Sequence, residues 1–299
     1  MRLATYSDGT REHTGIVIGD RIVNLAAAAQ AFGLPPCHDD LPGCIRAGAP
    51  ALDTLREIAR RCEADPSKGV PLGSVRLLAP IPRPARNVVC VGLNYADHVA
   101  ESASVVGAAA PQFPVLFTKP PQTVIGPDAE IPWHGRVSTA IDWEAELAVI
   151  IGREGRDIAE DDALSYVFGY TIGNDITARD LQERHQQWYK GKGLDGFCPL
   201  GPVVVTADEI ADPQRLDIAL RVNGETKQSA NTRQMIFSIA RLIAEWSAGM
   251  TLLPSDILLT GTPSGVGVGR KPPEFLRPGD LVEAEIPAIG ILRNRVAAA

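Results

Sequence analysis

From residue 87 onward the sequence is a series of short apolar segments, with only a few helical patterns between them. Segments of about four to eight residues, rich in Val and Ile and bounded by turn residues, are typical of β-strands. The expected strands cover residues 87–91, 115–118, 143–151, 167–172, 203–206, 217–222, 257–260 and 281–286, and the expected helices cover residues 160–164, 178–188 and 232–247. Because the helices are few and do not alternate regularly with the strands, the pattern favours an α+β, β-rich fold over a doubly wound parallel sheet.

The first 75 residues have a different organisation. The pattern predicts strands at residues 1–6, 14–18 and 21–24 and helices at residues 25–32 and 52–63. A Pro- and Gly-rich stretch at residues 66–84 follows, and such a composition indicates a semi-rigid connector. We therefore predict a small N-terminal α/β domain at residues 1–75 and a larger domain at residues 76–299.

The charge balance limits the possible partners of the chain. Its 36 acidic and 29 basic residues give a net charge of -7, whereas proteins that bind phosphate backbones usually carry a basic surface. No apolar run approaches the roughly 20 residues of a membrane-spanning helix, and residues 1–20 lack the apolar middle of a signal peptide. We therefore expect no nucleic-acid partner, no membrane partner and a cytoplasmic location.

Three acidic residues stand at the ends of two predicted strands. Glu144 and Glu146 are two residues apart on one strand, so their side chains point to the same face. Neighbouring carboxylates on an apolar strand repel each other and lose hydration, so that one takes up a proton or a cation joins them. With Asp175 after the next strand, they would suit Mg²⁺ or Mn²⁺. Alternatively, the strand lies at a solvated edge and its acids face water.

A histidine and a glutamate follow the first strand of the larger domain. His98 and Glu101 are three residues apart, which places them on one face of a helical turn. A carboxylate beside an imidazole orients the ring and raises its basicity, so this pair could act as a general base. A surface pair on a short helix is the alternative. The small residues at 103–114 predict a loop, either an ordinary one or a lid.

Further polar residues follow Asp175. Arg179 and Gln182 are again three apart, and Lys192 stands among glycines, where it could approach an anionic substrate or simply occupy a solvated turn. Residues 259–269 are rich in glycine but lack the Gly-Lys-Ser/Thr ending of a phosphate loop, which excludes a nucleotide site. Thr262 and the neighbouring backbone N–H groups could still hold a carboxylate.

These segments, in this order, resemble the fumarylacetoacetate hydrolase family from about residue 75 to the C-terminus. The resemblance is carried by GLNY at 92–95 with His98 and Glu101, DWEAEL at 142–147, ND at 174–175, ARD at 178–180 with Gln182, Lys192 with FCPLGP at 197–202, VNGE at 222–225, NT at 231–232 with MIF at 235–237, and GTPSGVG at 261–267. The founding enzyme has a further metal-binding aspartate near the position of Asn94. The three-carboxylate pattern is therefore closer to the acylpyruvate hydrolase and oxaloacetate decarboxylase branch.

The resemblance implies a mixed β-roll or β-sandwich catalytic domain, generally in a homodimer. It also implies roles for particular residues. Mg²⁺ or Mn²⁺ would bind Glu144, Glu146 and Asp175, His98 with Glu101 would activate water, and Lys192, Arg179, Gln182, Thr262 and Tyr95 would face the substrate.

The reaction expected from this resemblance is hydrolysis of a C–C bond in a 2,4-dioxo acid of the acylpyruvate or fumarylpyruvate type. The cation would hold the 2-oxo acid and stabilise the departing pyruvate enolate, while Lys192 and Gln182 would stabilise the oxyanion formed by attack of water. Oxaloacetate decarboxylation and isomerisation of a hydroxymuconate-type diacid are the enzymatic alternatives. A metal-binding structural dimer without turnover is the non-enzymatic one.

Overall fold

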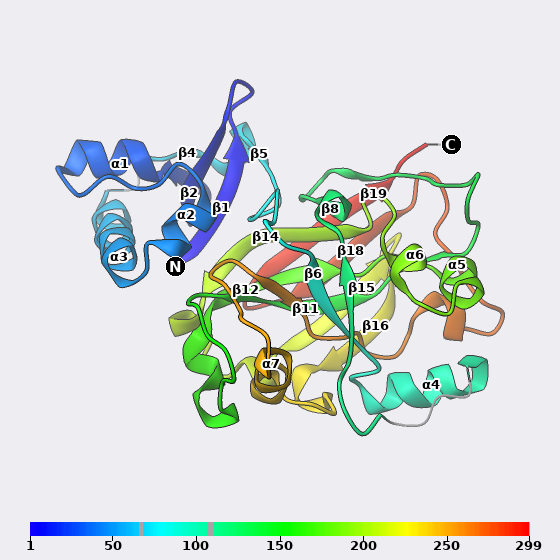
Figure 1. The fold of residues 1–299 in the computed structure, drawn as a ribbon. Coiled ribbons are helices and arrows are strands. Elements are labelled where there is room, and N and C mark those ends of the chain that lie inside the picture. The colour runs from blue at the N-terminus through cyan, green and yellow to red at the C-terminus, as the bar shows by residue number, and fades with distance from the viewer. Residues whose placement is uncertain (66–67, 107–110, 299) are drawn as a thin grey trace.

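The computed structural model describes residues 1–65, 68–106 and 111–298, and its strands form one large, one five-stranded and one two-stranded sheet over these ranges (Figure 1). The large sheet has the order β4 (Val70–Pro71), β3 (Arg21–Asn24), β2 (Glu12–Ile18), β1 (Arg2–Ser7), β14 (Cys198–Thr206), β12 (Val167–Asn174), β11 (Ala145–Ile151), β17 (Ile257–Leu259), β6 (Val88–Gly92) and β7 (Val115–Lys119), with β5 (Arg76–Leu77) on β1 and β8 (Val124–Ile125) on β14. The five-stranded sheet has the order β16 (Glu225–Asn231), β15 (Asp217–Val222), β18 (Leu281–Ile286), β19 (Gly290–Val296) and β9 (Glu130–Ile131), and β10 (Ile141–Asp142) pairs with β13 (Thr177–Ala178).

The central strand β11 is buried on both faces, which explains its continuous apolar sequence. Leu147 and Val149 belong to a core shared with residues of the five-stranded sheet, such as Leu220. The intervening Ala148 and Ile150 belong to a second core on the opposite face. The two sheets thus enclose one core between them, and the predicted β-rich fold is confirmed.

The N-terminal strands carry three helices, α1 (Leu25–Phe32), α2 (Leu41–Arg46) and α3 (Ala49–Ala64), and lie to one side in Figure 1. Strand β1 pairs with β14 through Leu3 and Val204, so these strands extend the large sheet. Strand β5, directly after the predicted boundary at residue 75, pairs back with β1. The division at that residue stays a prediction.

Three of the expected helices have different limits in the structure. The segment 178–188 contains only α5 (Arg179–Arg184), and a separate α6 (Tyr189–Lys192) follows because Gln186 has a left-handed backbone, with φ of 59°. The segment 232–247 begins with a 3-10 turn at Thr232–Gln234, and α7 (Ile239–Ser247) starts only where the Ser238 side chain caps it. The segment 160–164 is part of a 3-10 helix at Glu160–Tyr166.

The expected loop at residues 103–114 begins inside a helix, α4 (Ala96–Val106). Its glycine- and alanine-containing part, residues 107–110, lies outside the described residues, so the lid stays a prediction. Within the described ranges, no helix combines the length and apolar character required to cross a membrane.

Candidate metal centre and active site

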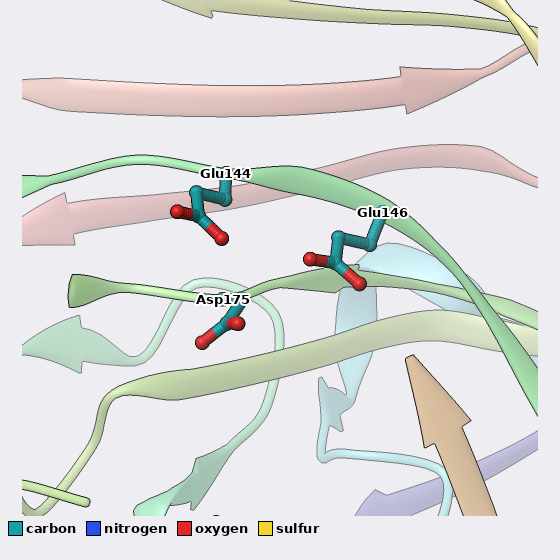
Figure 2. A group of neighbouring side chains, drawn as sticks. All are labelled: Glu144, Glu146 and Asp175. Carbon is teal, nitrogen blue, oxygen red and sulfur yellow. The ribbon is translucent and has the colours of Figure 1, made fainter. Parts of the chain in front are cut away.

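The register of β11 against β12 brings the three predicted metal ligands together. Ala145 pairs with Asn174 and Glu146 with Gly173, and the Asp175 backbone N–H donates to the carbonyl of Glu144 at 2.8 Å. One carboxylate oxygen from each of Glu144, Glu146 and Asp175 lies within 4.8 Å of the others (Figure 2). All three side chains are buried, so the alternative of a solvated edge strand is wrong.

Cationic side chains surround two of the three carboxylates. Lys192 Nζ lies 2.8 Å from Glu144 Oε2 and 2.7 Å from Asp175 Oδ2. Arg179 Nη2 lies 2.7 Å from Glu144 Oε1, and the fully buried Lys119 Nζ lies 2.5 Å from Asp175 Oδ1. Glu146 instead accepts the Gly261 N–H at 2.7 Å, and no described cationic side chain forms an ion pair with it.

This asymmetry separates the acidities of the two glutamates. Burial disfavours ionisation of both, but Lys192 and Arg179 overcome it at Glu144 and lower the pKa of its carboxyl to about 2. At Glu146 the charges of Asp175 and Glu144 add to the effect of burial and raise the pKa well above its usual value. Ionised Glu146 therefore needs additional positive charge.

The donor set fits a hard divalent cation. Three carboxylates supply oxygen ligands, which Mg²⁺ and Mn²⁺ prefer over nitrogen or sulfur. The negative charges of Asp175 and Glu144 both raise the pKa of Glu146, and no cationic side chain of the described residues forms an ion pair with it. A cation bound to all three would relieve that repulsion.

A cavity of about 360 Å³ opens beside Glu144 and is called the main cavity here. Six predicted side chains line it: His98, Glu144, Arg179, Gln182, Lys192 and Thr262. Its apolar wall, which the sequence did not predict, is formed by Val91, Leu93, Phe117, Trp188 and Val268. The cavity thus combines cationic, polar and apolar surfaces around the candidate metal centre.

The predicted pair of His98 and Glu101 forms on α4. His98 Nδ1 lies 3.4 Å from Glu101 Oε2, and both carboxylate oxygens of Glu101 accept the Gly265 N–H at 3.2 Å. Glu101 is therefore held by the backbone of a second segment while it orients the imidazole. The nitrogen opposite Glu101, Nε2, is then the one suited to exchange a proton with a ligand.

Two predicted substrate-facing residues, Thr262 and Tyr95, differ in how they lie relative to the main cavity. The Thr262 hydroxyl donates to the Ala145 carbonyl at 3.0 Å and accepts from Gln228 Nε2 at 2.8 Å, so it braces β11 as well as lining the cavity. Tyr95 is buried, with 1% of its surface exposed, and it is not among the described residues that line the main cavity. Its contact with substrate stays a prediction.

Asn94 has only structural contacts within the described residues. Its side chain donates to the carbonyls of Phe237 and Thr260 and accepts the Phe237 N–H. A neutral amide bound in this way holds the loop after β6 against the loop after β17. This agrees with the three-carboxylate pattern, in which Asn94 is not a ligand.

Sequence reasoning missed Asp142 and left Lys119 without a role. Asp142 is fully buried beside Arg179, with Oδ2 lying 2.8 Å from Arg179 Nε. A charged residue two positions before the paired glutamates was the available signal for Asp142. For Lys119 the signal was a lysine at the end of an apolar strand, but its partners come from segments far along the chain.

Comparison with known proteins then assigns the family. Residues 87–297 match the family model described as Fumarylacetoacetate (FAA) hydrolase C-terminal. The chain belongs to the fumarylacetoacetate hydrolase family. The expected family and its fold are thus confirmed, and the chain is an enzyme of this family.

Its relatives differ in the reactions they are named for. The chain is 44% identical over 302 residues to an oxaloacetate tautomerase of Bacillus subtilis, covering 99% of this chain and 100% of that one. It is 47% identical over 241 residues to a human mitochondrial oxaloacetate tautomerase, covering 80% and 75% of the two chains. A solved fumarylacetoacetate hydrolase from Exiguobacterium antarcticum is 40% identical and superposes with a TM-score of 0.83 over 100% of both chains.

Proposed function

We propose that this protein is a divalent-metal-dependent tautomerase that interconverts the enol and keto forms of oxaloacetate. The observation that carries the proposal is the convergence of His98, Arg179 and Lys192 on one cavity beside three buried carboxylates. The names of two relatives, one of which matches over its whole length, favour this reaction over the acylpyruvate hydrolysis expected from the sequence.

The cavity residues have complementary tasks in such a reaction. Oxaloacetate is a dianion, and the side chains of Arg179 and Lys192 supply positive charge for its carboxylates. A cation on Glu144, Glu146 and Asp175 would supply Lewis-acid polarisation of the 2-oxo group. In the conversion of keto to enol, Nε2 of His98, whose ring Glu101 orients, would accept a proton from C3 of the substrate. Addition of a proton to the 2-oxo oxygen then completes the enol.

Hydrolysis of a 2,4-dioxo acid is the second candidate, and the size of the main cavity favours it. A volume of about 360 Å³ with an apolar wall leaves room for an acyl tail that oxaloacetate lacks. The same His98–Glu101 pair would then deprotonate a water molecule instead of C3. Both candidates use one set of residues, so only product analysis separates them.

The test follows the fate of the substrate with the Mg²⁺- or Mn²⁺-loaded protein. For oxaloacetate, the enol absorbance reports tautomerisation and a lactate dehydrogenase assay reports pyruvate formed by decarboxylation. We expect faster loss of enol absorbance without a matching rise in pyruvate, and no acceleration after chelation. Release of pyruvate from acylpyruvates, with enol decay at its uncatalysed rate, would instead favour the hydrolase.

The apolar wall provides a prediction about Gly92. A Cβ at this position would overlap the indole ring of Trp188, which packs edge-on against Phe117 at 5.2 Å between ring centroids. Gly92→Ala should displace the indole into the cavity and lower kcat/KM on the order of 10- to 100-fold, because small misplacements of a substrate are costly. Steady-state kinetics with oxaloacetate measure the effect.

Two further variants check this explanation. Gly73→Ala is the matched control, because an added Cβ there meets nothing within 4 Å, and it should behave like the wild type. Adding Trp188→Ala to Gly92→Ala should restore part of the lost kcat/KM by removing the overlapping ring. A double variant no better than Gly92→Ala would show that the indole is not the cause.

A further inference from the structure

Asp142 is a buried carboxylate with four hydrogen-bond donors. Its Oδ1 accepts the N–H of Gly267 at 2.6 Å and that of Trp143 at 2.8 Å. Its Oδ2 accepts the N–H of Val268 at 3.0 Å and Arg179 Nε at 2.8 Å. The side chain is fully buried and is not among the described residues that line the main cavity. A charge satisfied so completely holds its partners in one arrangement.

One side of Asp142 leads to Glu101. The backbone at residues 265–269, called the glycine loop here, donates from Gly267 and Val268 to Asp142 and from Gly265 to Glu101. The fit is tight, because a Cβ on Gly267 would lie 2.7 Å from Asp142 Oδ1 and a Cβ on Gly269 would overlap the Glu101 side chain. Asp142 and Glu101 therefore bind the same short loop, so the loop conformation that Asp142 helps to hold also sets where the Gly265 N–H meets the Glu101 carboxylate.

The other side of Asp142 leads to Arg179. The guanidinium is bound at Nε by Asp142 and at Nη2 by Glu144, at 2.8 and 2.7 Å, and its Nη1 donates to Gln182 Oε1 at 3.1 Å. Two carboxylates on one planar group define its orientation in the cavity wall. Without Asp142, only Glu144 and Gln182 among the described residues would bind the Arg179 side chain.

We propose that Asp142 is a positioning residue that couples the His98–Glu101 pair to Arg179 through the glycine loop. This inference rests on the proposed function, since it assigns Asp142 to the same reaction without contact with the substrate. Two of the groups that act on the substrate, the His98–Glu101 pair and Arg179, then depend on one carboxylate behind the cavity wall.

Asp142→Asn tests this coupling with little change in shape. An asparagine has one acceptor oxygen and one NH₂ group where the aspartate has two acceptor oxygens. Its NH₂ group must therefore face one of the two pairs of donors, either Gly267 and Trp143 or Val268 and Arg179, and that pair loses its acceptor. We expect kcat/KM to fall on the order of 10- to 100-fold, as for other residues that orient catalytic groups indirectly. Asp256→Asn is the matched control, because Asp256 is also buried and accepts from Arg86 and a backbone N–H.

A double-mutant cycle with Glu101→Gln separates positioning from general destabilisation. If Asp142 acts through Glu101, Asp142→Asn should cost much less in the Glu101→Gln background than in the wild type. Equal fold losses in the two backgrounds would overturn the coupling, as would an Asp142→Asn variant with wild-type kcat/KM.

Hydrogen exchange tests the loop without relying on activity. In the wild type the amides of Gly267 and Val268 should exchange slowly, because both donate to a buried carboxylate, and Asp142→Asn should speed their exchange while Asp256→Asn does not. Fast exchange in the wild type would overturn the proposal even if Asp142→Asn fails to fold. A wild type that does not tautomerise oxaloacetate would refute the proposed function alone, and exchange would still show whether Asp142 orders the loop.

Discussion

His98→Ala is expected to lower kcat for enol–keto interconversion of oxaloacetate by about 10²- to 10⁴-fold, the usual contribution of a positioned general base. His98 lines the main cavity, and Glu101 holds its ring with a carboxylate that is itself held by the Gly265 N–H. In His98→Ala a water molecule would have to act as the base in place of an imidazole that Glu101 holds in position, and the rate should therefore fall. Stopped-flow measurement of the enol absorbance reports the loss.

The control for this substitution is His185→Ala. His185 is exposed at the end of α5, so its removal should leave kcat unchanged. Cation binding by His98→Ala should persist, since the three carboxylates do not include His98. An unchanged rate in His98→Ala would contradict the general-base assignment. Decarboxylation needs no such base, so pyruvate formation that survives the substitution would point to that reaction instead.

Removal of the divalent cation is expected to abolish activity and to lower the melting temperature. Binding to the folded state alone stabilises a protein by about 2.7 kcal/mol when the free ion is at 100 times its Kd. Glu146→Gln should remove this stabilisation, because the amide lacks the charge that completes the site. Calorimetric unfolding with and without Mn²⁺ measures both effects.

The melting temperature of Glu146→Gln without the ion provides a sharper comparison. Glu146 is buried, its pKa is raised by Asp175 and Glu144 in addition to burial, and no described cationic side chain pairs with it. A neutral amide should therefore cost the ion-free fold no more than the acid does. We expect an ion-free melting temperature at or above that of the wild type, without an increase on adding Mn²⁺. Glu245→Gln, on the partly exposed face of α7, should retain that increase. A Glu146→Gln protein that Mn²⁺ still stabilises would exclude this metal centre.

Local patterns predicted much of the fold and part of the site. The alternation of two residues per strand placed Glu144 and Glu146 on one face, and helical spacing placed His98 beside Glu101, as the structure has them. The helix expected at 178–188 is interrupted by the left-handed backbone of Gln186. The periodicity of apolar residues does not report such a backbone conformation, so the sequence pattern could not predict the break. The reaction expected from the resemblance was acylpyruvate hydrolysis, with oxaloacetate decarboxylation as one alternative, whereas the relatives are named oxaloacetate tautomerases.

The sequence by itself determined the residue types and their spacing along each strand, because these depend on neighbours within a few positions, and the order of its short motifs indicated the family. Only the tertiary structure decided which charges meet. Lys119, Arg179 and Lys192 reach the carboxylates of Glu144 and Asp175 from three separate elements, and Gly265 of the glycine loop donates to Glu101 from a position 164 residues away. Strand register and loop packing create these contacts, and the contacts set the raised pKa of Glu146 and the lowered pKa of Glu144.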